Sequence, residues 1–169
     1  DINDLTVVAG SDRSRQESVA LGLAALGRCE ADTVVLVHDA ARPLTPPQVT
    51  GRVIDAVAGG AGAVIPVLPV TDTLKTVDAF GVVVGTPRRS DMVAVQTPQG
   101  FRWDVLIRAH EEGASLGADE ARAATDDAGL VEAIGGIVHT VAGDERSMKV
   151  TRPLDLALAR LLADQEQAD

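Results

Sequence analysis

The sequence predicts one α/β domain over residues 1–169, a three-layer sandwich with a mostly parallel sheet. Three observations favour this class. Residues 34–37 are apolar without alternation, which is typical of a strand buried on both faces. Apolar runs alternate along the chain with helix-forming segments. The composition is 46% hydrophobic but 2% aromatic, which favours a layered core of Val, Leu, Ile and Ala.

The expected elements follow in chain order. Strands are predicted at 5–8, 34–37, 63–70, 92–95, 137–141 and 148–150, and helices at 14–26, 46–58, 103–112, 128–134 and 154–164. Ser14 and Glu17 have capping-box spacing, and Pro46 suits a first helical position. Pro66 and Pro69 argue against an ordinary central strand at 63–70. The apolar stripe of the last helix comprises Leu154, Leu158, Leu161 and Leu162, which we expect to face inward.

Residues 71–89 have a different character and predict a projecting β-hairpin arm. Residues 73–77 alternate in polarity, 78–81 form a turn, and 82–85 read as a second short strand. A lone hairpin is marginally stable in water, so this arm needs something to pack on. A second subunit is the expected partner, and the sequence therefore predicts a homodimer through the arm.

Composition excludes several classes of protein. The net charge of -10 argues against nucleic-acid binding, which requires clustered Lys and Arg. The single cysteine, Cys29, excludes an internal disulfide and is expected to be a small apolar filler at a helix end. No apolar run reaches the length of a membrane span, and no signal peptide opens the chain. We therefore expect a cytoplasmic protein that does not interact with membranes.

Polar residues repeatedly follow the predicted strands, where ligands bind in open α/β sheets. Asp39 and Arg42 follow the first buried strand, although Asp39 alone also fits a turn or helix cap. The other polar residues that follow predicted strands are Thr73, Lys75, Arg89, Thr97, Thr125, Asp126 and Lys149. One strand-end carboxylate with several cations suits a Mg²⁺-phosphate ligand better than hydrolysis by a carboxylate pair.

The histidines and serines are less specific. His38 is next to Asp39 and is expected to fix the loop by hydrogen bonding rather than to transfer a proton. His110 and His139 are interpreted as surface or core-edge residues. Ser11 and Ser18 fit helix capping and a ligand site equally well.

Five ordered motifs nevertheless form a recognisable set: HDAARP (38–43), TDTLK (71–75), AVQTPQGF (94–101), TDDAGLVE (125–132) and MKVTRPLDL (148–156). With these motifs the chain resembles the 2-C-methyl-D-erythritol 4-phosphate cytidylyltransferase family of the non-mevalonate isoprenoid pathway. The resemblance implies a Rossmann-like nucleotidyltransferase fold. It also implies transfer of a cytidylyl group from CTP to the alcohol phosphate, with Mg²⁺ as cofactor and release of pyrophosphate.

The resemblance also implies a role for each matching residue. Gly10, Ser11 and Ser18 would lie at the cytosine end. Asp39 would hold Mg²⁺ and contact the ribose or phosphate region, with Ala40 beside it. The acceptor phosphate and the α-phosphate would be lined by Arg42, Thr97, Thr125 and Lys149. Thr73 and Arg89 would reach the site of the partner subunit.

One departure from the family stands out. The family begins with a strand and a glycine-rich AAGxGxR loop that wraps the triphosphate, and this chain has no such motif. We expect an incomplete copy of the protein rather than a truncated, inactive form. The alternatives are a ribitol 5-phosphate or other polyol-phosphate cytidylyltransferase, which the HDAARP motif disfavours, and a non-catalytic binding module that kept only the fold.

Overall fold

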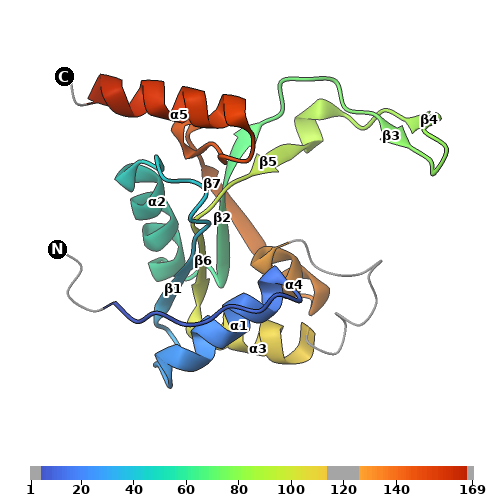
Figure 1. Ribbon diagram of the computed structural model, residues 1–169. Helices are drawn as coiled ribbons and strands as arrows, with labels where there is room; N and C mark the ends of the chain where they lie inside the picture. The colour runs from blue at the N-terminus through green and yellow to red at the C-terminus, as the bar shows by residue number, and fades with distance from the viewer. Residues whose placement is uncertain (1–4, 114–125, 167–169) are drawn as a thin grey trace.

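Helices cover both faces of a five-stranded sheet in residues 5–113 and 126–166, the part of the chain that the computed structural model describes (Figure 1). The helices are α1 Arg15–Leu26, α2 Pro47–Ala58, α3 Trp103–Gly113, α4 Asp127–Ala133 and α5 Pro153–Glu166. The strands are β1 Val34–Val37, β2 Ala63–Pro69, β3 Thr76–Val77, β4 Val83–Gly85, β5 Val93–Val95, β6 Gln99–Arg102 and β7 Val138–Ala142. Short 3₁₀ turns span Arg89–Asp91 and Glu145–Ser147.

The sheet is mixed and mostly antiparallel, so the expectation of a mostly parallel sheet is wrong. β6 lies between β1 and β2 and runs against both, and β5 also runs against β2. Among the described strands, only β2 and β7 pair in parallel. The uninterrupted apolar run in β1 indicates that both faces are covered, but it carries no information about strand direction. β6 was not predicted either, because the QTPQG stretch that leads into it has the composition of a turn.

The sheet separates two apolar cores, because successive residues of a strand point to opposite faces. Val35 and Val37 of β1 pack in the core formed with α1, α3 and α4. Val34 and Leu36 pack in the core formed with α2. Figure 1 shows α2 on one side of the sheet and α3 and α4 on the other. The predicted three-layer arrangement is therefore confirmed.

β2 is the centre of the sheet despite its prolines, and Pro66 lies where its partner changes from β6 to β5. β6 pairs with residues 63–64 of β2, and β5 pairs with 67–69. The Pro66 carbonyl accepts a 2.8 Å bond from the Gln96 N–H on the side of β5 and β6. Because proline has no N–H, this pair lacks only the reciprocal bond to the Gln96 carbonyl, at the point where the partner of β2 changes.

Three local predictions differ from the structure. Residues 5–8 form no strand, and Leu5 and Val7 are 74% and 87% exposed. Residues 148–150 are also irregular, after a 3₁₀ turn. Three of the four predicted leucines of α5 do not face a core, since Leu154, Leu158 and Leu161 are 78%, 45% and 55% exposed. Leu162 is half-buried, and Ala159 is buried. α5 lies along one end of the molecule rather than over a sheet face (Figure 1).

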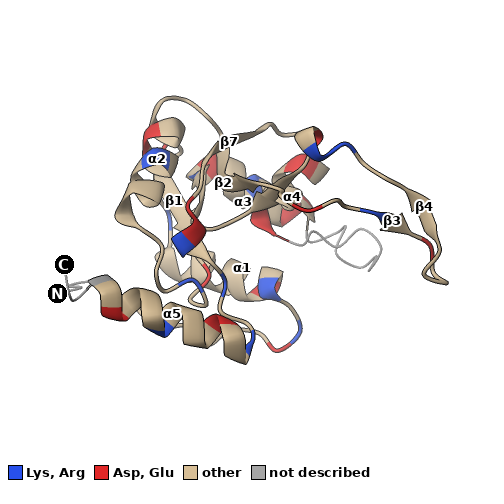
Figure 2. Ribbon diagram, turned by 90° about the horizontal axis from the view of Figure 1, so that it is seen from above, with Lys and Arg blue, Asp and Glu red and all other residues tan. Residues whose placement is uncertain are grey.

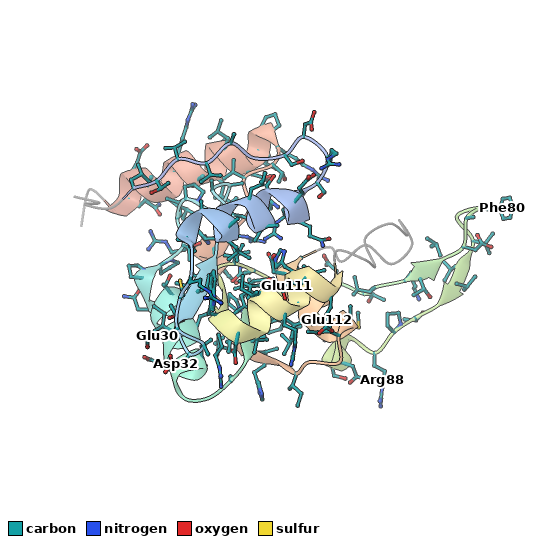
Figure 3. All side chains as sticks on the ribbon, turned by 90° about the horizontal axis from the view of Figure 1, so that it is seen from below. Glu30, Asp32, Phe80, Arg88, Glu111 and Glu112 are labelled. Atoms are coloured by element: carbon teal, nitrogen blue, oxygen red, sulfur yellow. The ribbon has the colours of Figure 1, made fainter. Side chains whose placement is uncertain are left out.

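The predicted arm is present as the β3–β4 hairpin, which extends away from the sheet (Figure 1). Its turn is closed by Asp78, whose Oδ1 accepts bonds of 2.9 Å from the N–H groups of Phe80 and Val82. Gly81 has a φ of 80°, which favours glycine. Phe80 lies at the tip and is 92% exposed (Figure 3). Charged residues are absent from β3 and β4 themselves, whereas basic segments flank the hairpin toward the body (Figure 2).

No helix in the described part of the chain has the length and apolar character needed to cross a membrane.

Candidate active site

The loop after β1 carries Asp39 and is fixed by the segment between β5 and β6. The backbone N–H of Asp39 donates to Oγ1 of Thr97 at 3.0 Å. The same Oγ1 is 2.9 Å from Nδ1 of His38. These contacts confirm the expectation that His38 fixes the loop through a hydrogen bond. They also explain the placement of Thr97, which is buried where β5 ends.

Three cations surround the Asp39 carboxylate. Lys149 Nζ lies 3.0 Å from Oδ2, Arg15 Nε lies 3.5 Å from Oδ1, and Arg42 Nε lies 3.8 Å from Oδ2. Burial by itself would raise the pKa of Asp39. The hydrogen bond and charge of Lys149, with the charges of Arg15 and Arg42, outweigh burial and hold the pKa below its ordinary value. Asp39 is therefore ionised at neutral pH.

Hydrogen bonds to backbone carbonyls join the loop that carries Asp39 to the segment that carries Lys149. Arg42 Nη1 donates to the Ser147 carbonyl at 2.6 Å. The Val150 N–H donates to the Ala41 carbonyl at 2.8 Å. Residues more than a hundred positions apart in the sequence are thus held in one cluster, and Lys149 is aimed at Asp39 although the predicted strand at 148–150 is absent.

Two buried glutamines order the floor of the site. Gln99 Nε2 donates to Oδ2 of Asp126 at 2.6 Å, and Asp126 caps α4 by accepting from the Gly129 N–H at 2.9 Å. Gln96 donates to the Asp144 carbonyl at 2.8 Å and accepts from the Asp144 N–H at 3.1 Å. Both glutamines are at most 4% exposed, and each buried side-chain amide both donates and accepts a hydrogen bond.

These groups enclose a cavity of about 170 Å³ at the strand ends. We call it the strand-end cavity, and it is lined by Arg15, Asp39, Arg42, Val95, Gln96, Thr97, Gln99, Asp126 and Lys149. Three cations face two carboxylates in it, a balance that suits a phosphorylated ligand. Of the residues predicted from sequence, the structure brings together Asp39, Arg42, Thr97 and Lys149. Thr125 lies outside the described residues, and Ala40 is exposed in the turn after Asp39.

Gly10, Ser11 and Ser18 lie together beside α1, at a second hollow. The Ser11 N–H donates to Oγ of Ser18 at 3.0 Å, and a Cβ on Gly10 would lie 3.1 Å from that oxygen. Gly10 and Ser18 line a groove of about 440 Å³ that runs along β1 to His38. Because His38 precedes Asp39, the groove ends next to the strand-end cavity.

Within this chain, Thr73 and Arg89 are not brought to the strand-end cavity. Thr73 is exposed in the arm. Arg89 donates from Nη1 to the Thr71 carbonyl at 2.8 Å and lines a different cavity of about 720 Å³ where the arm joins the sheet. Any role of these two residues at an Asp39 site therefore depends on a second subunit.

A set of charged residues behind the cavity was not predicted from the sequence. Arg15 links Asp39 to Asp127, and Asp127 lies 3.0 Å from His110. His110 is 8% exposed, so its assignment to the surface or core edge is wrong. The helical spacing of His110 gave no indication of a charged partner, because Asp127 belongs to the next described helix. Arg15 is far from Asp39 in the sequence, and no local pattern marks it.

An α/β sheet covered by helices, with a cationic cavity at its strand ends, is typical of the class of proteins that bind phosphorylated ligands outside the ends of their strands. A model of one family in that class, IspD: 2-C-methyl-D-erythritol 4-phosphate cytidylyltransferase, matches residues 2–165. The chain belongs to this family of nucleotidyltransferases, and the expectation from its five motifs is confirmed.

Individual relatives support the same assignment. The chain is 51% identical over 162 residues to the 2-C-methyl-D-erythritol 4-phosphate cytidylyltransferase of Rhodococcus jostii (strain RHA1), covering 96% of this chain and 67% of that protein. It is 53% identical to the protein of that name from Frankia casuarinae, covering 98% and 59%. The solved structure of the Thermus thermophilus enzyme of that name matches with a TM-score of 0.76 and 42% identity, over 93% of this chain and 72% of that chain. The chain thus spans between 59% and 67% of the length of these curated relatives.

Proposed function

We propose that this protein transfers a cytidylyl group from CTP to 2-C-methyl-D-erythritol 4-phosphate, in isoprenoid precursor biosynthesis. The observation that carries the proposal is the cluster of Arg15, Arg42 and Lys149 around one ionised carboxylate, in a chain of this family. The relatives at 51% and 53% identity carry the methylerythritol name, which supports this acceptor over ribitol 5-phosphate.

The reaction requires charge neutralisation more than covalent chemistry from the protein. A phosphate oxygen of the acceptor attacks the α-phosphorus of CTP, the new P–O bond forms, and the bond to the β-phosphate breaks. Pyrophosphate leaves with the bonding electron pair. Positioning and electrostatic stabilisation supply most of the catalysis in such transfers.

The residues of the strand-end cavity fit the acceptor and the α-phosphate. Lys149 and Arg42 would neutralise the phosphate oxygens, and Arg15 adds a third cation. Thr97, and Thr125 by its place in the motif, would donate hydroxyl hydrogen bonds. Gly10 and Ser18, in the groove that ends at His38, would receive the cytosine together with Ser11, which is hydrogen bonded to Ser18. Ala40 would lie beside the ribose.

Mg²⁺ fits this site only together with the nucleotide. Residues 5–113 and 126–166 contain no group of three or more His, Cys, Asp and Glu side chains placed to hold a metal ion. Magnesium commonly uses one or two carboxylates together with substrate phosphates, and Asp39 meets that requirement as a single protein ligand. When bound, the ion would withdraw charge from the phosphate oxygens. Asp39 would orient it, while Lys149 and Arg42 keep the carboxylate ionised.

We further propose that two chains form a homodimer through residues 71–89. Val77, Phe80, Val82 and Val84 are between 58% and 92% exposed, an apolar set that a second copy would cover. Thr73 and Arg89 would then serve the partner's strand-end cavity, since neither reaches the cavity of its own chain.

The test is turnover of CTP with each candidate acceptor, on the chain together with any residues that precede it in the natural protein. Pyrophosphate release is measured with 2-C-methyl-D-erythritol 4-phosphate, with ribitol 5-phosphate and with no acceptor. We expect release with the first at a kcat/KM at least about a hundredfold above the second, because polar contacts to a substrate hydroxyl discriminate strongly. Faster release with ribitol 5-phosphate would reassign the acceptor, and no release with any acceptor would favour a non-catalytic binding module.

A further inference from the structure

A buried carboxylate lies behind the strand-end cavity without lining it. Asp127, the first residue of α4, is 1% exposed. Its Oδ1 lies 3.0 Å from Nε2 of His110, and its Oδ2 accepts a 2.7 Å bond from Nη1 of Arg15. Burial would raise the pKa of Asp127, but the hydrogen bond of His110 and the charge of Arg15 outweigh burial and lower it. The carboxylate is therefore ionised, and His110 must donate from Nε2.

Arg15 is shared between this buried carboxylate and the cavity. Its short contact goes to Asp127, while its Nε lies 3.5 Å from Oδ1 of Asp39. A guanidinium pairs best with a carboxylate through two parallel bonds, and here neither carboxylate receives both. With Nη1 occupied by Asp127, Arg15 does not close onto Asp39. Its side chain remains 36% exposed and lines the cavity.

We propose that Asp127, held in place by His110, is a positioning residue that keeps the Arg15 guanidinium facing the strand-end cavity, where it is available to a nucleotide phosphate. The inference rests on the proposed function, because it takes CTP as the ligand. Without Asp127, Arg15 would pair with Asp39 through both of its nitrogens. Two charged groups that the ligand requires would then neutralise each other.

The proposal predicts that loss of the Asp127 charge weakens CTP binding, whereas net charge alone predicts tighter binding, so the two can be told apart. Replacing Asp127 by Asn removes a negative charge near a site for an anion, and this change alone would strengthen CTP binding. A purely structural role for Asp127 would lower thermal stability and leave the CTP affinity of the folded protein unchanged. Only the positioning role predicts weaker binding that depends on Arg15.

The experiment measures the dissociation constant of CTP by calorimetry at fixed MgCl2, with the Tm recorded for each variant. The protein is the chain together with any residues that precede it naturally. We expect Asp127→Asn and Arg15→Gln each to weaken CTP binding by about tenfold, and the double variant to bind no more weakly than Arg15→Gln, because coupled residues are not additive. Asp104→Asn is the matched control, since it removes a carboxylate from the exposed pair with Arg102. It should leave the dissociation constant unchanged.

A pair of variants at His110 gives an independent test, including the case in which Asp127→Asn does not fold. His110→Leu removes the donor to Asp127 and should weaken CTP binding by about threefold, whereas His110→Gln retains an N–H near the same place and should bind CTP like the parent. Unchanged or tighter binding in folded Asp127→Asn, additive effects in the double variant, or equal effects of Leu and Gln would overturn the positioning role. A parent protein that binds no CTP would instead refute the proposed function.

Discussion

Asp39 shows how several distant parts of the chain place one carboxylate. Asp39 follows β1, and its backbone N–H is hydrogen bonded to Thr97. Its carboxylate forms ion pairs with Arg15, near the start of the chain, and with Lys149, near its end. Each of these contacts is a few ångströms long and ordinary when taken alone. Their convergence lowers the pKa of Asp39 although burial acts against ionisation. The chemistry of the site therefore depends on the set of partners rather than on any single residue.

Asp39→Asn tests the central role of this carboxylate. We expect kcat/KM for pyrophosphate release to fall by at least about a hundredfold, because a preorganised charge partner is lost. The fold should stay intact, since Asn has nearly the same volume. Activity and circular-dichroism melting are compared with Asp104→Asn, a change on the exposed first turn of α3. Near-normal turnover in Asp39→Asn would contradict the proposed metal and nucleotide role.

Lys149→Ala tests the cation closest to Asp39. The side chain of Lys149 is 46% exposed, and exposed ion pairs contribute little stability, so we expect the Tm to change by only a few degrees. Turnover should fall by about a hundredfold. Arg102→Ala is the control, because it removes a comparably exposed cation paired with Asp104. A large loss of Tm with normal activity would instead indicate that Lys149 is structural.

The two carboxyls with depressed pKa values predict the direction of the acid response. Asp39 and Asp127 each add stability that is complete above an ordinary Asp pKa of about 4 and is lost as the pH falls through the lowered folded value. We expect the urea-derived free energy of unfolding to fall from about pH 5 toward pH 3. The fall should be smaller in Asp127→Asn than in the parent, and an identical slope in both proteins would contradict the lowered pKa of Asp127.

At the scale of elements, the contact between β6 and α2 decides how closely the second layer lies on the sheet. A Cβ added to Gly100 of β6 would overlap Cγ1 of Val53 and lie 3.2 Å from Cγ2 of Val57. Only a residue without a side chain permits this approach. β6 begins at Gln99, two residues after Thr97, so a displaced β6 would disturb the floor of the strand-end cavity.

Gly100→Ala should therefore destabilise the protein by about 1–3 kcal/mol through overpacking. Gly51→Ala is a matched control in α2, where no atom lies within 4 Å of the added Cβ. There we expect a gain of about 0.5–1 kcal/mol from better helix propensity. Urea unfolding measures both changes. Equal effects at the two positions would show that close packing at Gly100 does not limit stability.

At the scale of the whole molecule, the arm is the feature on which the proposed homodimer depends. The arm extends away from the sheet (Figure 1), its apolar side chains are largely exposed, and Arg89 lines a cavity that Asp39 does not line. Burying the apolar residues of the arm against a second copy would stabilise both chains at roughly 25 cal/mol per Å². The proposed dimer would also bring Arg89 to the strand-end cavity of the partner chain. There the planar guanidinium group of Arg suits phosphate better than the ammonium group of Lys would.

Complementation between two inactive variants tests this arrangement. An Arg89→Ala chain is mixed with an Asp39→Asn chain and heterodimers are isolated. If the arm acts in trans, one site of the heterodimer carries both defects and the other carries neither. Pyrophosphate release should then return to about half that of the parent dimer, as expected for a twofold assembly with one intact site. Heterodimers that recover no activity would show that Arg89 acts within its own chain.

Local sequence signals predicted a large part of this structure. Ser14 caps α1 as its spacing indicates, and the arm forms with its turn at residues 78–81. Asp39, Arg42, Thr97 and Lys149 were identified as strand-end residues, and they line one cavity. The predictions of the cap and the turn succeeded because capping and turn formation depend on residues within a few positions of one another.

Other features of the protein are decided only by how distant parts of the chain pack together. The direction of β6, the exposure of Leu154 on α5, and the contacts of Arg15 with Asp127 and of Asp127 with His110 involve residues that no local pattern connects. A buried strand has the same apolar composition in a parallel or an antiparallel sheet. A buried carboxylate likewise acquires its partners only when separate helices pack together. The sequence by itself therefore determined the layers, the family and the principal strand-end residues. Packing determined the direction of the strands and the contacts of Asp127 with Arg15 and His110 behind the cavity.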